Sequence, residues 1–343
     1  MSGIVEIKAA IQRFYSKNEV YINPILKFLL ALVVFAVINN KMGYMERLDS
    51  ITVVLVVALL CSFMPMTIMA LLAGMFILLH MYALAMEMAL VTAVVLFLMF
   101  LLYIRFVPNE TVVILLTPIL FMLKIPYVLP IAVGLFGGPV SIISIGCGVA
   151  ISHLIAFTSE NATTIATIDD GNMVSRIRYI VDGMIGDKAM FVTIAIFCFT
   201  LIIVYLLRRL SVDYSWTIAI GAGVVVEMVL LLICDLIFDL NFSIIGIILG
   251  SILSAAVGLF LQLFSFHLDY KKTEKLQFED EDYYYYVKAV PKVTVAMPNR
   301  RVKKINTARS DRGSSRSTGA RASAGGQTRT VHTANGATRT IKK

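Results

Sequence analysis

Long apolar runs separated by short polar connections make up most of the chain. The apolar segments cover residues 22–39, 51–65, 67–86, 88–106, 111–124, 126–136, 139–157, 188–208, 214–237 and 242–267. Several of them reach the roughly 18 apolar residues that mark a membrane-spanning helix. The pattern therefore predicts an all-α, polytopic transmembrane helix bundle of about 8 helices, with re-entrant hairpins where a segment is too short to cross.

Composition supports a membrane protein. Of the 343 residues, 59% are hydrophobic, whereas soluble domains contain about 45–50% apolar residues. The mean hydropathy is +0.84. These values exclude an ordinary soluble domain. They predict a transmembrane domain over residues 21–269, preceded by an amphipathic, cytoplasmic N-terminal helix at residues 1–20 with the lipid bilayer as its partner.

One apolar stretch, from Thr111 to Ser141, is broken by prolines and by a glycine pair. At 1.5 Å per residue, its arms at 111–124 and 126–136 would be about 21 and 16 Å long, whereas the hydrocarbon core is about 30 Å thick. The stretch is either one kinked spanning helix or a re-entrant hairpin. We expect Arg105 before the stretch to lie inside and the acidic loop 158–187, after the next helix, to lie outside. Since the helix at 139–157 already supplies one crossing, a stretch that enters and leaves on one side is required, and the hairpin is favoured. Broken helices of this kind are common at the substrate sites of transporters.

The same stretch resembles an earlier part of the chain. Residues 52–76 and 111–136 both begin with Thr-Val-Val, turn at a proline (Pro65 and Pro126) and close with Gly-x-Phe. Each is followed by one apolar helix. A hairpin plus one helix contains an odd number of crossings, so the second copy would be inverted. Residues 51–157 are therefore a candidate pair of inverted hairpin repeats, an architecture of transporters.

Charge predicts the orientation. Arg208 and Arg209 lie in a short loop, whereas the loop from Asp235 to Asn241 carries two acidic residues and no basic one. Lys and Arg are enriched in cytoplasmic loops. We therefore expect both termini in the cytoplasm and the loop after Asp235 outside.

The C-terminal part differs in composition. From Tyr270 onward there are 17 Lys or Arg and 6 Asp or Glu. Residues 270–297 form an acidic, tyrosine-rich cytoplasmic segment that suits a short strand or a docking motif. Residues 298–343 carry 12 Lys or Arg and only Asp311, which predicts a disordered basic tail. Its expected partner is anionic lipid, ahead of a cytoplasmic protein, with nucleic acid a weaker hypothesis.

Polar side chains at membrane depth are the candidates for chemistry. Glu227 lies in the middle of the run Tyr214–Asp239, where a carboxylate is costly unless it is paired, protonated or hydrated. It is either an ion-coupling group or a protonated carboxyl bonded to a neighbouring helix. Lys124, at the tip of the expected hairpin, could pair with it. The candidates for a substrate or ion pathway are Glu227, Lys124, Pro118, Pro126, Pro130, Gly137, Gly138, His153 and Asp235.

Other patterns indicate packing. Gly246, Gly250, Ser254 and Gly258 recur every four residues, a small-residue stripe that brings helices close together within the chain or in a homo-oligomer. The four cysteines lie in apolar segments without metal-ligand spacing. No cofactor or metal site is expected. Since HExxH, GxSxG and paired carboxylates on one helix are missing from the sequence, no catalytic residues are assigned and an enzyme is not expected.

The runs LTPILFMLKIPYVLPIAVGLFGGPVS and FEDEDYYYYVKAVPK resemble uncharacterised bacterial multipass membrane proteins labelled permease or ABC-transporter permease. The resemblance covers most of the chain. It implies a transporter or permease-like protein for a small solute or ion, located in a bacterial plasma (inner) membrane with both termini cytoplasmic. An ATPase would have to be a separate subunit, since the chain has no Walker A sequence. The alternative is a membrane scaffold or regulator that recruits partners through its cytoplasmic tail.

Overall fold

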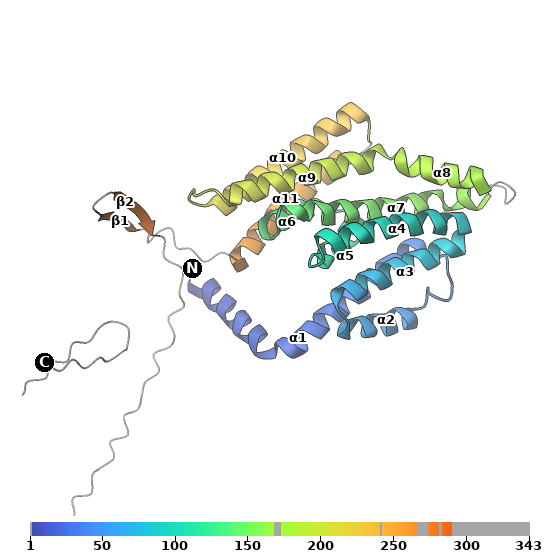
Figure 1. Cartoon of the computed structure of the whole chain (residues 1–343), viewed down its shortest axis with the longest axis horizontal. Coiled ribbons are helices and arrows are strands. Elements are labelled where there is room, and N and C mark those ends of the chain that lie inside the picture. Colours follow the sequence, from blue (N-terminus) through green and yellow to red (C-terminus); the bar gives the residue numbers. More distant parts are fainter. Residues whose placement is uncertain (1, 168–172, 241, 266–273, 281–282, 290–343) are drawn as a thin grey trace, which may run out of the picture. The chain divides into compact units, whose positions relative to one another are not determined.

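The computed structural model describes residues 2–167, 173–240, 242–265, 274–280 and 283–289. The expected basic tail at 298–343 lies outside these ranges. The elements, labelled in Figure 1, are α1 (Ser2–Met42), α2 (Ile51–Phe63), α3 (Met66–Leu84), α4 (Met86–Phe106), α5 (Thr111–Met122), α6 (Val128–Phe136), the 3-10 turn η1 (Pro139–Ser141), α7 (Ile142–Thr167), α8 (Met173–Ile185), α9 (Lys188–Arg208), α10 (Ser215–Phe238), α11 (Ile244–Ser265), β1 (Glu274–Glu279) and β2 (Tyr284–Ala289).

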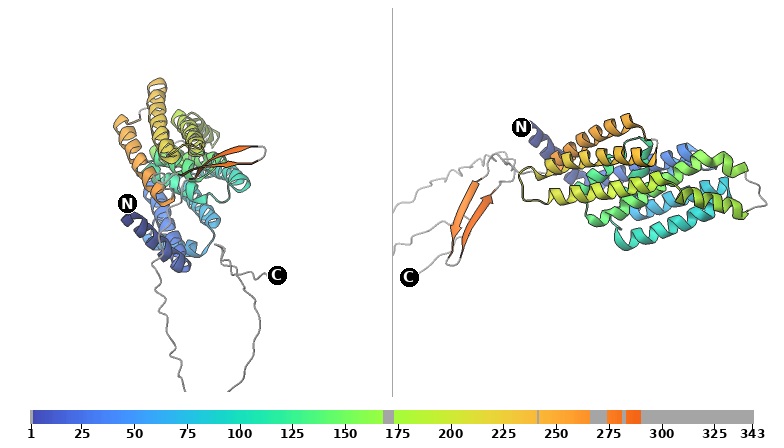
Figure 2. Two further views of the ribbon diagram at one scale, coloured as in Figure 1. Left: turned by 90° about the vertical axis from the view of Figure 1, so that its left-hand side faces the viewer. Right: turned by 90° about the horizontal axis from the view of Figure 1, so that it is seen from above.

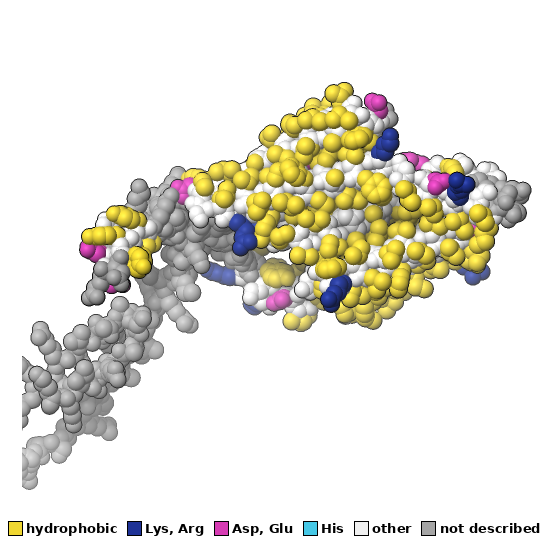
Figure 3. All heavy atoms as spheres, turned by 45° about the horizontal axis from the view of Figure 1, so that its top comes forward, with side chains coloured by type: hydrophobic (Ala, Val, Ile, Leu, Met, Phe, Trp, Pro, Cys, Tyr) yellow, Lys and Arg dark blue, Asp and Glu magenta, His cyan; other side chains and the backbone are white. Residues whose placement is uncertain are grey.

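The chain is a multipass membrane protein. Among the residues that the structure describes, seven helical segments are long and apolar enough to cross a membrane: Arg13–Met42, Met66–Leu84, Met86–Phe106, Pro139–Thr167, Met173–Arg208, Ser215–Phe238 and Ile244–Phe264. Hydrophobic side chains cover most of the face shown in Figure 3, and large ones such as Phe97 and Leu98 are more than half exposed. A surface of this kind is stable against lipid and not against water. The predicted fold class is confirmed.

Hydrogen bonds between distant residues define two ends of the bundle. At the first end, the Ser62 hydroxyl donates to the Pro24 carbonyl at 2.8 Å, and Thr217 bonds to Gln262. At the second end, His80 Nε2 lies 2.9 Å from Asn39 Oδ1. Helices α1 and α3 therefore both run from the first end to the second, and the short helix α2 returns the chain between them. Figure 2 shows the long helices packed side by side.

The broken segment is a hairpin and not a kinked spanning helix. Glu110, just before α5, accepts hydrogen bonds from the Ser141 hydroxyl at 2.5 Å and from the Ser144 hydroxyl at 2.8 Å. Both serines follow α6. The start of α5 and the end of α6 are therefore adjacent, which requires the chain to enter and leave at one end of the bundle. Between them it turns at Lys124 and Pro126.

The first proposed repeat does not match the second. In the first, α2 has 13 residues and α3 has 19, and α3 is long enough to cross the membrane alone. In the second, α5 has 12 residues and α6 only 9. Both copies do turn at the expected proline. The segment 51–84 thus pairs a short helix with a spanning helix, and only 111–136 is a hairpin with two short arms.

The region at 158–187, expected as an external loop whose second part forms an interfacial helix, is mostly helical where the structure describes it. Helix α7 continues to Thr167, and α8 turns its apolar face to the bundle, where Ile180 is fully buried. Arg176 of α8 donates to Glu87 in the first turn of α4 at 3.0 Å. Helix α8 is therefore fixed to the bundle by a buried ion pair in addition to its apolar contacts.

The N-terminal end of the described region is a kinked helix, and the C-terminal end is a pair of β-strands. Helix α1 includes the expected amphipathic segment at 1–20, and non-helical backbone angles at Asn18 separate that segment from the spanning part. Near the C-terminus, β1 and β2 pair antiparallel, with Gln277 opposite Tyr286. The tyrosine-rich segment at 270–297 therefore contains a two-stranded hairpin.

Candidate functional site

A cavity of about 520 Å³ lies at the tip of the α5–α6 hairpin. This volume is within the roughly 300–1,000 Å³ of typical small-molecule sites. Apolar side chains from α1, α5, α7, α9, α10 and the start of α11 form most of its wall. The polar lining residues are Lys41, Lys124, Tyr127, Ser152, His153, Thr193 and Ser243. Of the candidates from the sequence, Lys124, His153, Pro118 and Pro126 meet here.

The hairpin tip is built by a Schellman motif at the end of α5. The Lys124 N–H donates to Phe121 O at 3.1 Å, and the Ile125 N–H donates to Leu120 O at 2.9 Å. The motif requires a left-handed residue, and Lys124 occupies that position with φ = 58°. Glycine is usual there, because a Cβ in this conformation costs roughly 1–2 kcal/mol. A lysine at this position places a cation beside the negative end of the helix dipole and at the cavity.

His153 is oriented by a carboxylate. Its Nδ1 lies 2.7 Å from Asp187 Oδ2, while Asp187 Oδ1 accepts from the Met190 N–H and so caps α9. The edge of the Phe121 ring packs against the imidazole. With Nδ1 held by Asp187, Nε2 is the ring nitrogen that has no hydrogen-bond partner in the described ranges. The ring can offer it to a ligand as an acceptor or, when protonated, as a donor.

Positive charge dominates the cavity. Lys41 from the last turn of α1 and Lys124 both line it, and its lining includes no Asp or Glu within the described part of the chain. Ser243 and Gly246 also line it, so the first turn of α11 begins at its wall. Helix N-termini carry a partial positive charge and unpaired N–H groups. The arrangement favours a small anion with an apolar part.

Glu227 is not in the cavity wall. Its side chain is 0% exposed, and neither carboxylate oxygen has a hydrogen-bond partner among the described residues. The expected pair with Lys124 is therefore not formed. Leu231, one turn further along α10, does line the cavity, as does Tyr127 at the hairpin tip. Glu227 thus lies behind the cavity wall, not at its surface.

The remaining candidates have structural contacts elsewhere. Asp235 Oδ1 accepts from the Phe242 N–H at 2.9 Å and holds the turn between α10 and α11. Gly137 and Gly138 follow α6 at the first end. There the Arg208 guanidinium donates to the carbonyls of Leu135 and Gly137, which satisfies free carbonyl groups at the α6 C-terminus.

Pro130 and the small-residue stripe of α11 (Gly246, Gly250, Ser254 and Gly258) make packing contacts within the chain. Pro130 is buried in α6. On α11, a Cβ at Gly250 would lie 2.2 Å from the Tyr127 ring, and the Ser254 hydroxyl donates to Tyr127 O at 3.0 Å. Gly258 faces Ile220 of α10. The stripe therefore brings α11 against both the hairpin and α10.

Sequence reasoning missed Lys41 and Asp187 as parts of this site. Lys41 follows a spanning segment and looks like an ordinary interfacial lysine, while Asp187 looks like a loop residue. The only local indication for Asp187 was its N-cap position before an apolar run, which predicts capping and not a bond to a histidine 34 residues away.

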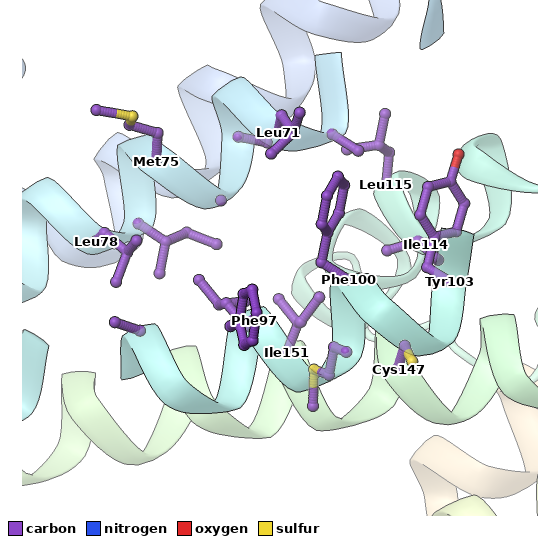
Figure 4. Close-up of a pocket in the computed structure, with 17 residues that line it drawn as sticks. Leu71, Met75, Leu78, Phe97, Phe100, Tyr103, Ile114, Leu115, Cys147 and Ile151 are labelled. Atoms are coloured by element: carbon purple, nitrogen blue, oxygen red, sulfur yellow. The ribbon is translucent and has the colours of Figure 1, made fainter. Parts of the chain in front are cut away.

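A second cavity, of about 330 Å³, lies between α3, α4, α5 and α7. Figure 4 shows Leu71 and Met75 of α3 on one side, with Phe97, Phe100 and Tyr103 of α4 on the other. Among the described lining residues, only Tyr103 contributes a side-chain oxygen, and that hydroxyl already bonds to Pro108 O and Thr111. This cavity can accept hydrocarbon but has little means to select a polar solute.

Comparisons with protein-family models, with curated proteins and with solved structures give no match for this chain. Its function is therefore inferred from its own geometry.

Proposed function

We propose that the chain is a permease-like membrane protein that binds a small organic anion in the cavity at the hairpin tip and moves it across the bilayer. The observation that carries the proposal is the set of basic groups, Lys41, Lys124 and His153, gathered in a largely apolar cavity whose described lining includes no carboxylate. The lysines would attract the charged group, while Phe121 and Phe197 would contact the apolar part.

The hairpin supports movement as well as binding. Its two arms begin and end at the first end of the bundle, whereas its tip reaches a cavity bordered by Lys41 at the end of α1. Non-helical backbone inside a membrane bundle is tolerated where it is buried in protein or lines a hydrated cavity. A short hairpin can rock against longer helices, and such elements bind substrates in secondary transporters. The predicted orientation would place the cavity on the external side, with both termini in the cytoplasm.

Lys124→Gly separates charge from backbone strain. Glycine adopts the left-handed conformation at the tip without strain. The free energy of unfolding of the variant should therefore equal that of the wild type or exceed it by about 1 kcal/mol, and its unfolding temperature should not fall. Loss of the ammonium group should weaken binding of benzenesulfonate about tenfold or more, since a hydrogen bond to a charged group contributes about 1.5–3 kcal/mol. Thermal unfolding of purified protein with and without choline benzenesulfonate measures both effects.

Lys188→Gln is the matched control, because Lys188 is exposed, lies next to Asp187 and is not a lining residue. It should leave benzenesulfonate binding unchanged. Uptake of radiolabelled benzenesulfonate into proteoliposomes then tests transport, since the sulfonate stays charged and crosses lipid poorly. Equal loss of binding in both variants, or wild-type protein without binding or uptake, would refute the proposal.

The rival function, a scaffold, has one structural observation in its favour. The β1–β2 hairpin exposes Tyr283, Tyr284, Tyr285 and Tyr286, and its outer strand edges can pair with an added strand. If the chain is a scaffold, deleting residues 270–343 abolishes cellular function at normal membrane abundance. The permease proposal expects proteoliposome uptake by the truncated protein to equal that of the full chain.

A further inference from the structure

The region around Glu227 contains several buried polar atoms that the protein itself does not satisfy. Both Glu227 oxygens, the Thr200 hydroxyl and the Ser251 hydroxyl are buried and have no hydrogen-bond partner in the part of the chain that the structure describes. Buried polar groups in native proteins are nearly always paired, so each exception needs a physical cause such as a bound ion or water. These residues come from three neighbouring helices, α10, α9 and α11.

Helix register brings Thr200 to Glu227. The antiparallel helices α9 and α10 touch where a Cβ at Gly223 would lie 2.4 Å from Val204. One turn along each helix from this contact, on the same faces, are Glu227 on α10 and Thr200 on α9. The carboxylate and the threonine hydroxyl therefore face each other across the α9–α10 interface.

The same argument brings Ser251 to the opposite side of the carboxylate. Gly258 of α11 faces Ile220 of α10 at 3.1 Å, measured from an added Cβ. Two turns from that contact, seven residues along each antiparallel helix, lie Glu227 and Ser251. Thr200 and Ser251 thus lie on the two sides of Glu227, close to the hairpin tip, where Tyr127 O accepts a hydrogen bond from the Ser254 hydroxyl of α11.

We propose that Glu227, Thr200 and Ser251 form a binding site for a monovalent metal cation such as Na⁺. Carboxylate and hydroxyl oxygens are the ligands of hard cations. The sequence analysis expected no metal site, because a single carboxylate and two hydroxyls carry no ligand motif.

Charge balance selects a monovalent ion. Thr200 and Ser251 are uncharged polar groups beside Glu227, whereas Lys41 and Lys124 line the neighbouring cavity, whose wall includes Leu231. One Na⁺ would neutralise the buried carboxylate, whereas a divalent ion would leave an excess positive charge at membrane depth, which is unfavourable. A proton would also neutralise the charge, but it would not bring a partner within hydrogen-bond distance of the Thr200 and Ser251 hydroxyls, which have none among the described residues.

The test is cation-dependent thermal unfolding of the purified full-length chain in detergent. NaCl and KCl are each compared with choline chloride at the same ionic strength. A cation that binds the folded state raises the unfolding midpoint in a saturable way. We expect this rise for wild type, its loss in Glu227→Gln, and an apparent affinity at least tenfold weaker in Thr200→Val and Ser251→Ala. Equilibrium binding of radioactive Na⁺ should show the same order.

Thr92→Val is the matched control, because Thr92 of α4 is another buried hydroxyl with no partner within the described ranges. It should keep the wild-type cation response. The proposal fails if the wild-type midpoint is equal in sodium, potassium and choline salts, or if Glu227→Gln responds like wild type. Should Glu227→Gln not fold, the Thr200 and Ser251 variants still decide, because unchanged affinity in both would overturn the site. Anion binding is not needed for any of these results, so they are independent of the proposed permease function.

Discussion

Replacing Arg176 with Gln should destabilise the protein by about 3–5 kcal/mol, because it leaves the buried Glu87 carboxylate without its charged partner. The two side chains are only 7% and 10% exposed, and their atoms are 3.0 Å apart. They join α8 to the first turn of α4. Thermal or denaturant unfolding of the purified protein in detergent would measure the change.

Arg178→Gln, two residues further along α8, is the matched control. Arg178 pairs with Asp182 at 3.5 Å, but these side chains are 82% and 70% exposed, and exposed pairs of this spacing contribute about 0.3–0.5 kcal/mol. A double substitution of Glu87 and Arg176 by leucine should cost much less than either single change, since no charge stays buried. Equal effects for the Arg176 and Arg178 variants would show that the inner pair does not hold α8.

Hydrophobic pattern and proline positions predicted much of the fold because they act locally. Most apolar runs became helices close to their expected ends, whereas α7 continues to Thr167, ten residues past its expected end. The turn fell at Lys124 and Pro126, where proline cannot continue a helix. The hairpin was favoured over a kinked helix by charge alone. The hydrogen bonds that close the hairpin run from Ser141 and Ser144 to Glu110. They join residues more than thirty positions apart, and no sequence pattern predicts them.

The candidate site was only partly predictable for the same reason. A polar residue in an apolar run, such as Glu227 or His153, stands out in a sequence because burial makes it costly. Whether it is paired depends on register between helices. The Asp187 bond to His153 and the position of Thr200 beside Glu227 follow from helix packing, which one-dimensional spacing does not report. Conversely, Gly137 and Gly138 stood out as breaks but belong to the α6 end that Arg208 caps.

Gly148→Ala should destabilise the protein and disable the cavity together. A Cβ at Gly148 of α7 would lie 2.5 Å from Thr117 Oγ1 and 2.6 Å from Thr117 Cβ. Thr117 is fully buried in α5, so α5 must move away from α7. Overpacking of this kind costs about 1–3 kcal/mol, which exceeds the gain of up to about 1 kcal/mol from replacing a helical glycine. The displacement would carry Pro118 and Lys124 with it, so benzenesulfonate binding should fall with stability.

Gly146→Ala in the same helix is the control, because a Cβ there meets only Ile194, at an ordinary 3.8 Å. It should leave the unfolding midpoint unchanged or raise it. Combining Gly148→Ala with Thr117→Gly removes both clashing atoms and should restore part of the lost stability and binding, although the new glycine costs about 1 kcal/mol in the α5 helix. Such a recovery is a coupling energy between the two positions. If Gly148→Ala instead has the same unfolding midpoint and the same benzenesulfonate affinity as Gly146→Ala, then α5 is not held against α7 at Thr117. The position of the hairpin tip would then not depend on that contact.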